Sequence, residues 1–355
     1  MDVLKAAWDR GMYVCNTSLL CSLPIYFPRN TYDTANTYSN GESERVIGKF
    51  VEKVNLIHCS EWFVVSDPTS QNKIPRNQII ILTKCYNLVR GFEGSMHDGQ
   101  YETLGKTREY VNNRGLSRAA VFNAVSDSLE RLNTTYIDLL QIHRFDPDVP
   151  VEETMKALHD LVESGKVRYI GASSMRTWQF ALMNEVAERR GWTKFASMQN
   201  QYSLLYREEV DIPLFIDSLP NLISYIQERE MLPYCAFNGI GVIPWGPVGG
   251  GLLTRPVGET TARAKTRNRP DPKDWYSEAD RDIVNRVEEV AKQTGKSMAQ
   301  VALAWVVGKV SNAIIGLSSV KRIEESLIDG FELTKEQISY LEEPYVHLPI
   351  GKSCS

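Results

Sequence analysis

The sequence predicts an α/β fold of the (β/α)8 TIM-barrel class. The first observation is a repeated order of short apolar runs and amphipathic helix-length stretches, which continues from residue 31 almost to the end of the chain. The second is that nearly every apolar run ends in a polar or aromatic residue, as in a barrel whose strands deliver side chains to its carboxyl face. The sequence contains no GxGxxG turn, which disfavours the rival doubly wound open sheet.

The expected strands are seven runs that are mostly apolar throughout, as parallel strands buried on both faces should be. They cover residues 31–35, 78–84, 136–143, 167–174, 195–203, 241–247 and 313–319. The expected helices cover residues 41–53, 117–132, 151–165, 178–190, 228–239, 277–294, 297–309 and 321–329. Seven strands are one fewer than a closed (β/α)8 barrel needs.

The composition indicates a protein that acts on small molecules. The 355 residues can bury the core of one large domain or of two ordinary ones, and a single domain over residues 1–355 is expected. The formal net charge of -4 gives no basic surface for nucleic acid or an anionic membrane. No apolar run reaches the roughly 18 residues of a membrane span, and the N-terminus lacks the layout of a signal peptide. A cytoplasmic protein is therefore expected. The six cysteines lie at no metal-ligand spacing, so no metal is expected.

The ends of the first three strands carry the candidate catalytic residues. Asp33 ends the first strand, Lys84 the second and His143 the third, and Tyr38 follows Asp33 by five positions. Each alone has a structural explanation, such as a helix cap or a satisfied core histidine. Together they favour chemistry, because a buried lysine needs a carboxylate partner, which Asp33 can supply. A nearby ammonium would lower the pKa of the Tyr38 phenol from about 10 and ease proton donation.

Asp33, Tyr38, Lys84 and His143, in that order, resemble the catalytic tetrad of the aldo-keto reductase superfamily. The resemblance runs from about residue 31 to residue 343, through DTANTYSNGESE, LTKCYNLVRG, YIDLLQIHRFDP, GKVRYIGASS, MQNQYSLLYREE, GVIPWGP and RIEES. Within the superfamily the sequence resembles the fungal branch near aryl-alcohol dehydrogenases, versiconal hemiacetal acetate reductases and the potassium-channel β subunits.

This resemblance implies a barrel that binds NADPH across its carboxyl face and passes hydride to an aldehyde or ketone. It implies that Tyr38 is the general acid and that Lys84 tunes its pKa. Asp33 would then hold Lys84 in place, and His143 would donate a hydrogen bond that orients the carbonyl.

The resemblance also implies a set of cofactor-binding residues. Ser173, Ser174 and Gln199 match the residues that bind the nicotinamide amide in the family. Trp245 matches the aromatic residue that stacks beneath the nicotinamide. The loop 246–251 would pass the pyrophosphate, because glycines let backbone N–H groups approach phosphate closely. An arginine that meets the 2′-phosphate favours NADPH over NADH. The whole implied set is Ser173, Ser174, Gln199, Trp245, Gly246, Val248, Gly251, Ser318, Arg322 and Glu325.

The chain departs from the family pattern in three ways. Gly246, the pair Gly249–Gly250 and Ser326 replace a serine, an alanine–arginine pair and an asparagine, so weaker cofactor binding is expected. The chain begins in what corresponds to the first barrel helix, so the N-terminal hairpin and first strand are expected to be missing and the barrel edge open. Residues 13–29, 54–71 and 210–227 interrupt the pattern, either as specificity loops or as translated introns.

Other functions fit parts of the pattern. A lysine-dependent aldolase would use Lys84 as a Schiff-base nucleophile, although an ion pair with Asp33 would keep that lysine protonated. A binding module similar to the channel β subunits, or an inactive truncated barrel, would hold NADPH without efficient turnover.

The long connection 85–117 is the expected wall of the substrate site. Its aromatic side chains suit a flat or hydrophobic carbonyl compound, such as an aryl aldehyde or an intermediate of fungal secondary metabolism. The residues expected in this wall are Tyr86, Phe92, Met96, His97 and Tyr101.

Overall fold

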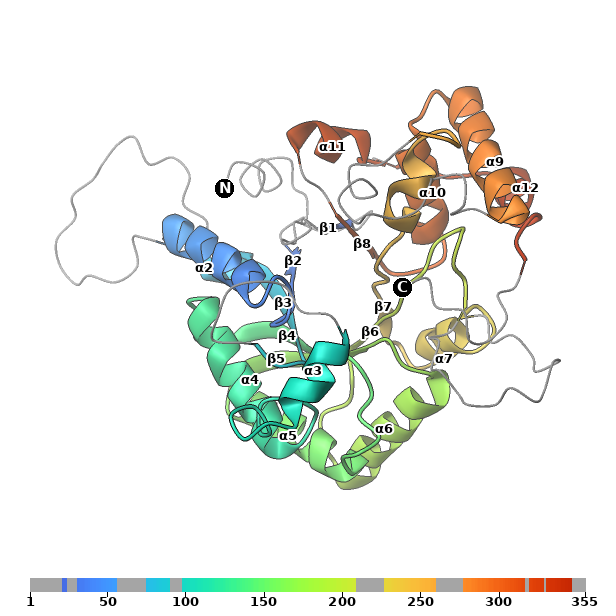
Figure 1. Ribbon diagram of the computed structural model, residues 1–355. Coiled ribbons are helices and arrows are strands. Elements are labelled where there is room, and N and C mark those ends of the chain that lie inside the picture. The colour runs from blue at the N-terminus through green and yellow to red at the C-terminus, as the bar shows by residue number, and fades with distance from the viewer. Residues whose placement is uncertain are drawn as a thin grey trace.

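The centre of the molecule is a parallel sheet whose strands neighbour one another in chain order (Figure 1). The computed structural model describes residues 21–23, 31–55, 75–89, 98–208, 227–259, 277–316, 319–328 and 330–346. The six parallel strands are β2 (Thr31–Asp33), β3 (Ile80–Cys85), β4 (Ile137–Ile142), β5 (Val167–Ser173), β6 (Ser197–Gln199) and β7 (Gly241–Val242). A doubly wound sheet would reverse its strand order at a switch point. This order has no reversal, so the prediction of a barrel-type sheet is confirmed.

Two further strands extend the curve of the sheet. β8 (Ala313–Ile315) follows β7, because Trp245 forms a parallel bridge with Ile314, whose N–H donates to the Pro244 carbonyl over 2.8 Å. β1 (Cys21–Leu23) pairs antiparallel with β8 and also lies against β2. All seven predicted strands are thus present, together with one that was not predicted.

The expected open barrel edge is only partly filled among the described residues, because β2 remains the edge strand of the six-stranded sheet. β1 comes from the predicted insertion 13–29 and covers the edge of β8. The direction of β1 is antiparallel, unlike that of the strands in a regular (β/α)8 barrel. It still pairs with the backbone donors and acceptors along the edge of β8. The predicted absence of an N-terminal hairpin concerns residues outside the described ranges.

Helices follow most strands and cover the outside of the sheet (Figure 1). Side-chain caps mark several starts: Ser277, Ser297 and Thr334 each accept a backbone N–H of the first turn. Gly191 and Gly295 end two helices in the left-handed conformation that glycine adopts readily. The helices are α2 (Glu42–Asn55), α3 (Asp98–Gly105), α4 (Arg118–Arg131), α5 (Val151–Glu163), α6 (Thr177–Arg190), α7 (Met231–Phe237), α9 (Glu278–Thr294), α10 (Met298–Val307), α11 (Val320–Glu325) and α12 (Lys335–Glu342).

Two of these helices, α3 and α12, were not predicted, because each lies in a stretch without clear apolar periodicity. Among the described helices, none combines the length and the apolar character that a membrane span requires.

A buried carboxylate fixes the helix that follows the first parallel strand. Glu44 on α2 is fully buried and accepts hydrogen bonds from Arg131 Nε over 2.7 Å and from Thr83 Oγ1 over 2.5 Å. Gly48 lets α2 approach α4 closely, because a Cβ there would clash with the Arg131 carbonyl. Glu44 therefore connects α2, α4 and β3 behind the predicted catalytic residues.

The third predicted insertion, residues 210–227, ends inside the fold. Gln227 donates its backbone N–H to the Arg207 carbonyl over 2.9 Å, and its side-chain amide donates to the carbonyls of Gln201 and Glu208. The chain therefore leaves after Glu208 and returns beside the same residues. The rest of that segment lies outside the described ranges. Of the second predicted insertion, only residues 54 and 55 are described, and they extend α2 beyond its predicted end.

Candidate active site

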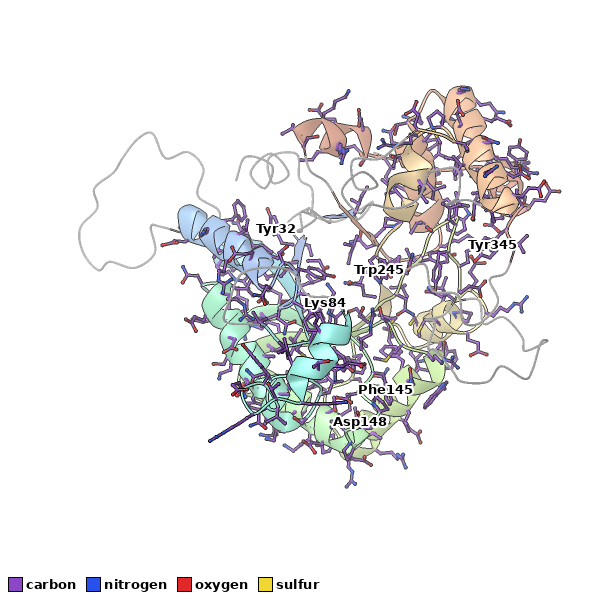
Figure 2. The ribbon with its side chains drawn as sticks, viewed as in Figure 1. Tyr32, Lys84, Phe145, Asp148, Trp245 and Tyr345 are labelled. Atoms are coloured by element: carbon purple, nitrogen blue, oxygen red, sulfur yellow. The ribbon has the colours of Figure 1, made fainter. Side chains whose placement is uncertain are left out.

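Asp33 and Lys84 form a buried ion pair inside the curved sheet. Asp33 lies opposite Leu82 in the β2–β3 pair, so Lys84, two residues further on, faces the same side. Lys84 Nζ donates to Asp33 Oδ2 over 2.7 Å and to the Thr34 carbonyl over 2.8 Å, and both charged side chains are 1% exposed. The predicted ion pair is therefore present, and Figure 2 labels the position of Lys84. A lysine held in this way stays protonated, which argues against a Schiff-base aldolase.

Tyr38 lies on the turn that joins β2 to α2. Lys84 Nζ lies 5.0 Å from the centroid of the Tyr38 ring. The chain after Tyr38 takes three consecutive left-handed residues, with φ values of 46° at Ser39, 54° at Asn40 and 87° at Gly41. Such a conformation costs energy at non-glycine residues and persists only where the surroundings enforce it. The turn therefore holds the phenol beside the buried ammonium.

His143 completes the group at the end of β4. Its ring lies edge-on to Tyr38, with centroids 5.8 Å apart and planes at 77°, and its backbone N–H donates to the Cys85 carbonyl over 2.9 Å. Nδ1 is buried and finds no hydrogen-bond partner among the described residues. Desolvation lowers the pKa of His143 well below its ordinary value, and the charges of Lys84 and Arg144 lower it further. The imidazole is therefore neutral at neutral pH and offers one N–H donor.

The lowered pKa of His143 predicts a loss of stability in mild acid. The unfolded chain has a histidine pKa near 6.5 and binds a proton below it, whereas the folded ring does not. Below about pH 6.5 the free energy of unfolding should therefore fall, by up to about 1.4 kcal/mol per pH unit, until the lower folded pKa is reached. Urea unfolding of the wild type and of His143→Gln between about pH 5 and pH 8 measures this slope.

The variant should lack this contribution to the slope. The matched control is His159→Gln, because His159 lies on α5, where Nδ1 contacts Thr193 Oγ1 at 3.1 Å, away from the ion pair. Identical pH dependence in wild type and His143→Gln would contradict the prediction.

Ser173, Ser174 and Gln199 gather at the ends of β5 and β6. Ser173 Oγ donates to the Gln199 carbonyl over 2.7 Å and lies 3.3 Å from Ser174 Oγ. Ser174 has a left-handed φ of 52°. The Gln199 amide points into the sheet interior, where Nε2 donates to Asp33 Oδ1 and to Gln141 Oε1, each over 3.1 Å. The three residues therefore meet as predicted, and Gln199 also contacts the ion pair.

Trp245 and the glycine loop follow β7. The backbone N–H of Trp245 donates to the Asn200 carbonyl over 2.9 Å, and the half-buried side chain lies beside β7 and β8 (Figure 2). Gly246, Gly249, Gly250 and Gly251 all have left-handed φ values, between 58° and 100°. Only a glycine-rich sequence adopts this backbone conformation without strain.

Two backbone N–H groups of this loop, one of them at the predicted Gly251, donate hydrogen bonds within the loop itself. The N–H groups of Gly249 and Gly251 donate to the carbonyls of Gly246 and Val248, over 2.9 and 3.0 Å. At Gly250 an added Cβ would meet nothing within 4 Å, so the backbone there is open to a ligand. The loop fits the passage of a phosphate group chiefly at Gly250, a position that the predicted set did not include.

Arg322 and Glu325 lie on α11, immediately after β8. Ser319 caps this helix by accepting the Arg322 N–H over 3.3 Å, and both predicted side chains are exposed. Lys321 lies 3.6 Å from Glu325 on the same helix. Ser318 lies outside the described residues.

Sequence reasoning missed Gln141, Thr37, Phe145 and Trp178. Gln141 lies two residues before His143 on β4, and the two-residue period of a strand was the signal that would have placed it on the same face. Thr37 shares a hydrogen bond with Tyr101 of α3, which puts part of the predicted substrate wall against the Tyr38 turn. Phe92, Met96 and His97 of that wall lie outside the described ranges.

An aromatic pair lies beyond His143. The rings of Phe145 and Trp178 have centroids 6.2 Å apart, and Trp178 is 57% exposed. Neither was predicted, because contact between them depends on how the loop after β4 meets the start of α6.

Cys85, beside Lys84, has its pKa raised to about 12 by burial, so its thiol stays protonated and is a poor nucleophile.

Comparison with known proteins agrees with this arrangement. Residues 28–345 match the profile described as the Aldo/keto reductase family. The chain is 45% identical over 358 residues to an aldo-keto reductase of Fusarium vanettenii, covering 99% of this chain and 82% of the relative. It is 43% identical over 326 residues to the versiconal hemiacetal acetate reductase of Aspergillus parasiticus, covering 89% and 82%. A Schizosaccharomyces pombe protein named as an aryl-alcohol dehydrogenase is 41% identical over 360 residues, covering 98% and 92%.

A solved structure supports the fold alone. The crystal structure of the thermostable aldo-keto reductase Tm1743, in complex with the inhibitor epalrestat, superposes with a TM-score of 0.61 at 20% identity. The match covers 97% of this chain and 86% of that chain.

Proposed function

This chain belongs to the aldo/keto reductase family, a family of oxidoreductases that use nicotinamide cofactors, and from that premise we propose that it reduces an aldehyde or ketone to the alcohol with NADPH. The observation that carries the proposal is the Asp33–Lys84 ion pair, with Lys84 Nζ 5.0 Å from the Tyr38 ring centroid. NADPH, when bound, supplies the hydride. The residues of the chain supply the proton, the orientation and the binding.

Tyr38 is the proposed proton donor. As hydride reaches the carbonyl carbon, negative charge develops on the carbonyl oxygen, and a phenol can donate its proton there. Lys84 makes that donation easier, because a buried positive charge stabilises the phenolate that is left. Asp33 keeps Lys84 charged in an otherwise unfavourable interior.

His143 is the proposed hydrogen-bond donor to the carbonyl oxygen. Because its pKa is lowered, the ring is neutral at neutral pH and acts through one N–H. A neutral donor polarises the carbonyl without competing with Tyr38 as the acid. The edge-on contact with Tyr38 brings both donors to one region.

The proposed NADPH site runs along the strand ends from β5 to α11. Ser173, Ser174 and Gln199 would hold the carboxamide of the nicotinamide, and Trp245 would lie against its ring. The backbone of the loop from Gly246 through Val248 to Gly251 would meet the pyrophosphate. The adenosine end would meet Ser318, Arg322 and Glu325.

Arg322 is expected to set the preference for NADPH over NADH. A charge-assisted contact with the 2′-phosphate predicts that Arg322→Ala weakens NADPH binding by about 1.5–3 kcal/mol and hardly changes NADH binding. Fluorescence titration with each nucleotide measures both dissociation constants. The matched control is Lys321→Ala, which removes a positive charge from the same exposed helix and should have a much smaller effect. Equal losses for NADPH and NADH in Arg322→Ala would place the arginine elsewhere.

The proposed substrate is a flat or hydrophobic carbonyl compound, such as an aryl aldehyde or a carbonyl intermediate of fungal secondary metabolism. Two observations support this class: the ring of Phe145, in the loop that follows His143, packs against that of Trp178, and Tyr101 contacts Thr37, next to Tyr38 in the chain. We further propose that the protein acts in the cytoplasm on small molecules, without a nucleic-acid or membrane partner.

A screen of carbonyl compounds tests the proposal. Purified protein is mixed with NADPH and a panel of aryl, alkyl and polyketide-like carbonyls, and the fall in NADPH absorbance is followed. Faster oxidation with aromatic carbonyls than with matched alkyl ones is expected. Tight NADPH binding without oxidation by any member of the panel would instead indicate a binding module.

A further inference from the structure

Gln141 connects the two halves of the candidate site. It lies on β4, is fully buried, and pairs in register with Lys84 on β3 and Gly171 on β5. Its Nε2 donates to Asp33 Oδ1 over 3.1 Å, and its Oε1 accepts from Gln199 Nε2 over 3.1 Å. One side chain therefore touches both the ion pair and a proposed cofactor residue.

The sheet leaves room for this side chain at one glycine. A Cβ at Gly171 would lie 3.2 Å from Gln141 Cγ and 2.5 Å from Ser197 Oγ. Any larger residue would push Gln141 away from Asp33 or displace the neighbouring strand. The absence of a side chain at Gly171 is thus what allows the amide of Gln141 to reach across the interior.

The Asp33 carboxylate receives three N–H donors. Lys84 binds Oδ2, whereas Gln141 and Gln199 both bind Oδ1. Donors on Oδ1 draw negative charge away from the oxygen that faces Lys84, because hydrogen bonds polarise a carboxylate. Less of the Lys84 charge is then neutralised by Asp33, and more of it acts on the Tyr38 phenol.

The same contacts fix the orientation of the Gln199 amide. Its nitrogen must face Asp33, because an amide oxygen there would meet the carboxylate oxygen with no proton between them. The nitrogen has two hydrogens, and Asp33 Oδ1 and Gln141 Oε1 accept them. Gln199 therefore has only its oxygen left to offer a ligand.

We propose that Gln141 is a positioning residue that sets both the acidity of Tyr38 and the orientation in which Gln199 receives the cofactor. Gln199 accepts a hydrogen bond from the NH2 group of the nicotinamide carboxamide, and Gln141 keeps it in that orientation. This inference rests on the proposed function, because it takes Gln199 to be a nicotinamide contact.

The first arm of the test needs no variant. Equilibrium binding of NADP⁺ is compared with that of its 3-acetylpyridine analogue, in which a methyl group replaces the carboxamide NH2. The wild type should bind NADP⁺ roughly 2- to 12-fold more tightly, the usual worth of one neutral hydrogen bond. Equal binding of the two nucleotides would overturn the proposed orientation.

The second arm uses Gln141→Met, which keeps the length of the side chain and removes its hydrogen bonds. The Gln199 amide is then held by Asp33 alone and can tilt about that one hydrogen bond, so the preference for NADP⁺ should become smaller. The alkaline limb of the pH profile of kcat should move to higher pH, because Asp33 neutralises more of the Lys84 charge and the phenol becomes a weaker acid. A role limited to packing would move neither the nucleotide preference nor the limb.

The matched control is Ser197→Ala, at the residue beside Gly171. Ser197 Oγ is buried without a hydrogen-bond partner among the described residues, so its loss should leave both readouts unchanged. A Gln141→Met variant that binds NADP⁺ and reduces carbonyls with the wild-type preference and pH profile overturns this inference alone. A wild type that neither binds NADP⁺ nor oxidises NADPH overturns the proposed function, and this inference with it.

Discussion

Tyr38→Phe is expected to lower the rate of carbonyl reduction by about 10²–10⁴-fold, the usual worth of general acid catalysis, while NADPH binds almost normally. The ring remains, so its contacts with Lys84 and His143 are kept, and only the proton donor is lost. Steady-state kinetics with the best substrate of the carbonyl screen and fluorescence titration with NADPH measure the two quantities. Loss confined to kcat, with KM little changed, is expected for an interaction made in the transition state.

The control for this variant makes the same substitution at the other end of the strands. Tyr136 precedes β4, and its ring packs against the guanidinium groups of Arg76 and Arg168, at 4.0 and 4.6 Å from the ring centroid. Tyr136→Phe should keep the wild-type rate. Near-normal turnover by Tyr38→Phe would show that another group donates the proton.

Lys84→Met is expected to cost about 3–5 kcal/mol in the free energy of unfolding, because it leaves the Asp33 carboxylate buried without its counter-charge. The side chains are each 1% exposed, so water cannot replace the missing partner. The amides of Gln141 and Gln199 remain bonded to Asp33, which places the expected cost toward the lower end. Urea unfolding at neutral pH measures it.

A double variant separates stability from catalysis. In Lys84→Met with Asp33→Leu neither charge is buried, so much of the lost stability should return, as replacement of a buried pair by apolar groups commonly allows. Activity should not return, because no ammonium then acts on Tyr38. A double variant less stable than Lys84→Met alone would mean that packing around Asp33, rather than its charge, determines the stability of this region.

The positions of the candidate catalytic residues could be predicted from the sequence because they depend on short-range order. A parallel strand that ends in Asp33 or Lys84 delivers that residue to a shared edge, whatever the rest of the fold does. The hydrogen bonds of Gln199 could not be predicted in this way. Its partners Asp33 and Gln141 come from strands 166 and 58 residues away, and only the curvature of the sheet brings them together.

Two other differences have similarly nonlocal causes. β1 occupies the edge of β8 because an extended segment can satisfy a strand edge without a strong sequence pattern, and three residues carry too little periodicity to predict. α3 has little amphipathic pattern of its own, and its place against the Tyr38 turn rests on the contact between Tyr101 and Thr37. The seven longer apolar runs, in contrast, were recognisable because their burial on both faces selects apolar residues throughout.

The meeting of Gln227 with Arg207 has a practical consequence for protein engineering. The backbone contact of 2.9 Å and the ion pair of Arg207 with Glu228 bring the two flanks of the chain together. A sequence inserted between residues 208 and 227 would therefore begin and end beside the same residues, and it would not have to cross the barrel. Affinity tags, fluorescent reporters or the new termini of a circular permutant are best introduced at this junction, where a change in chain length need not alter the spacing of Asp33, Lys84 and His143.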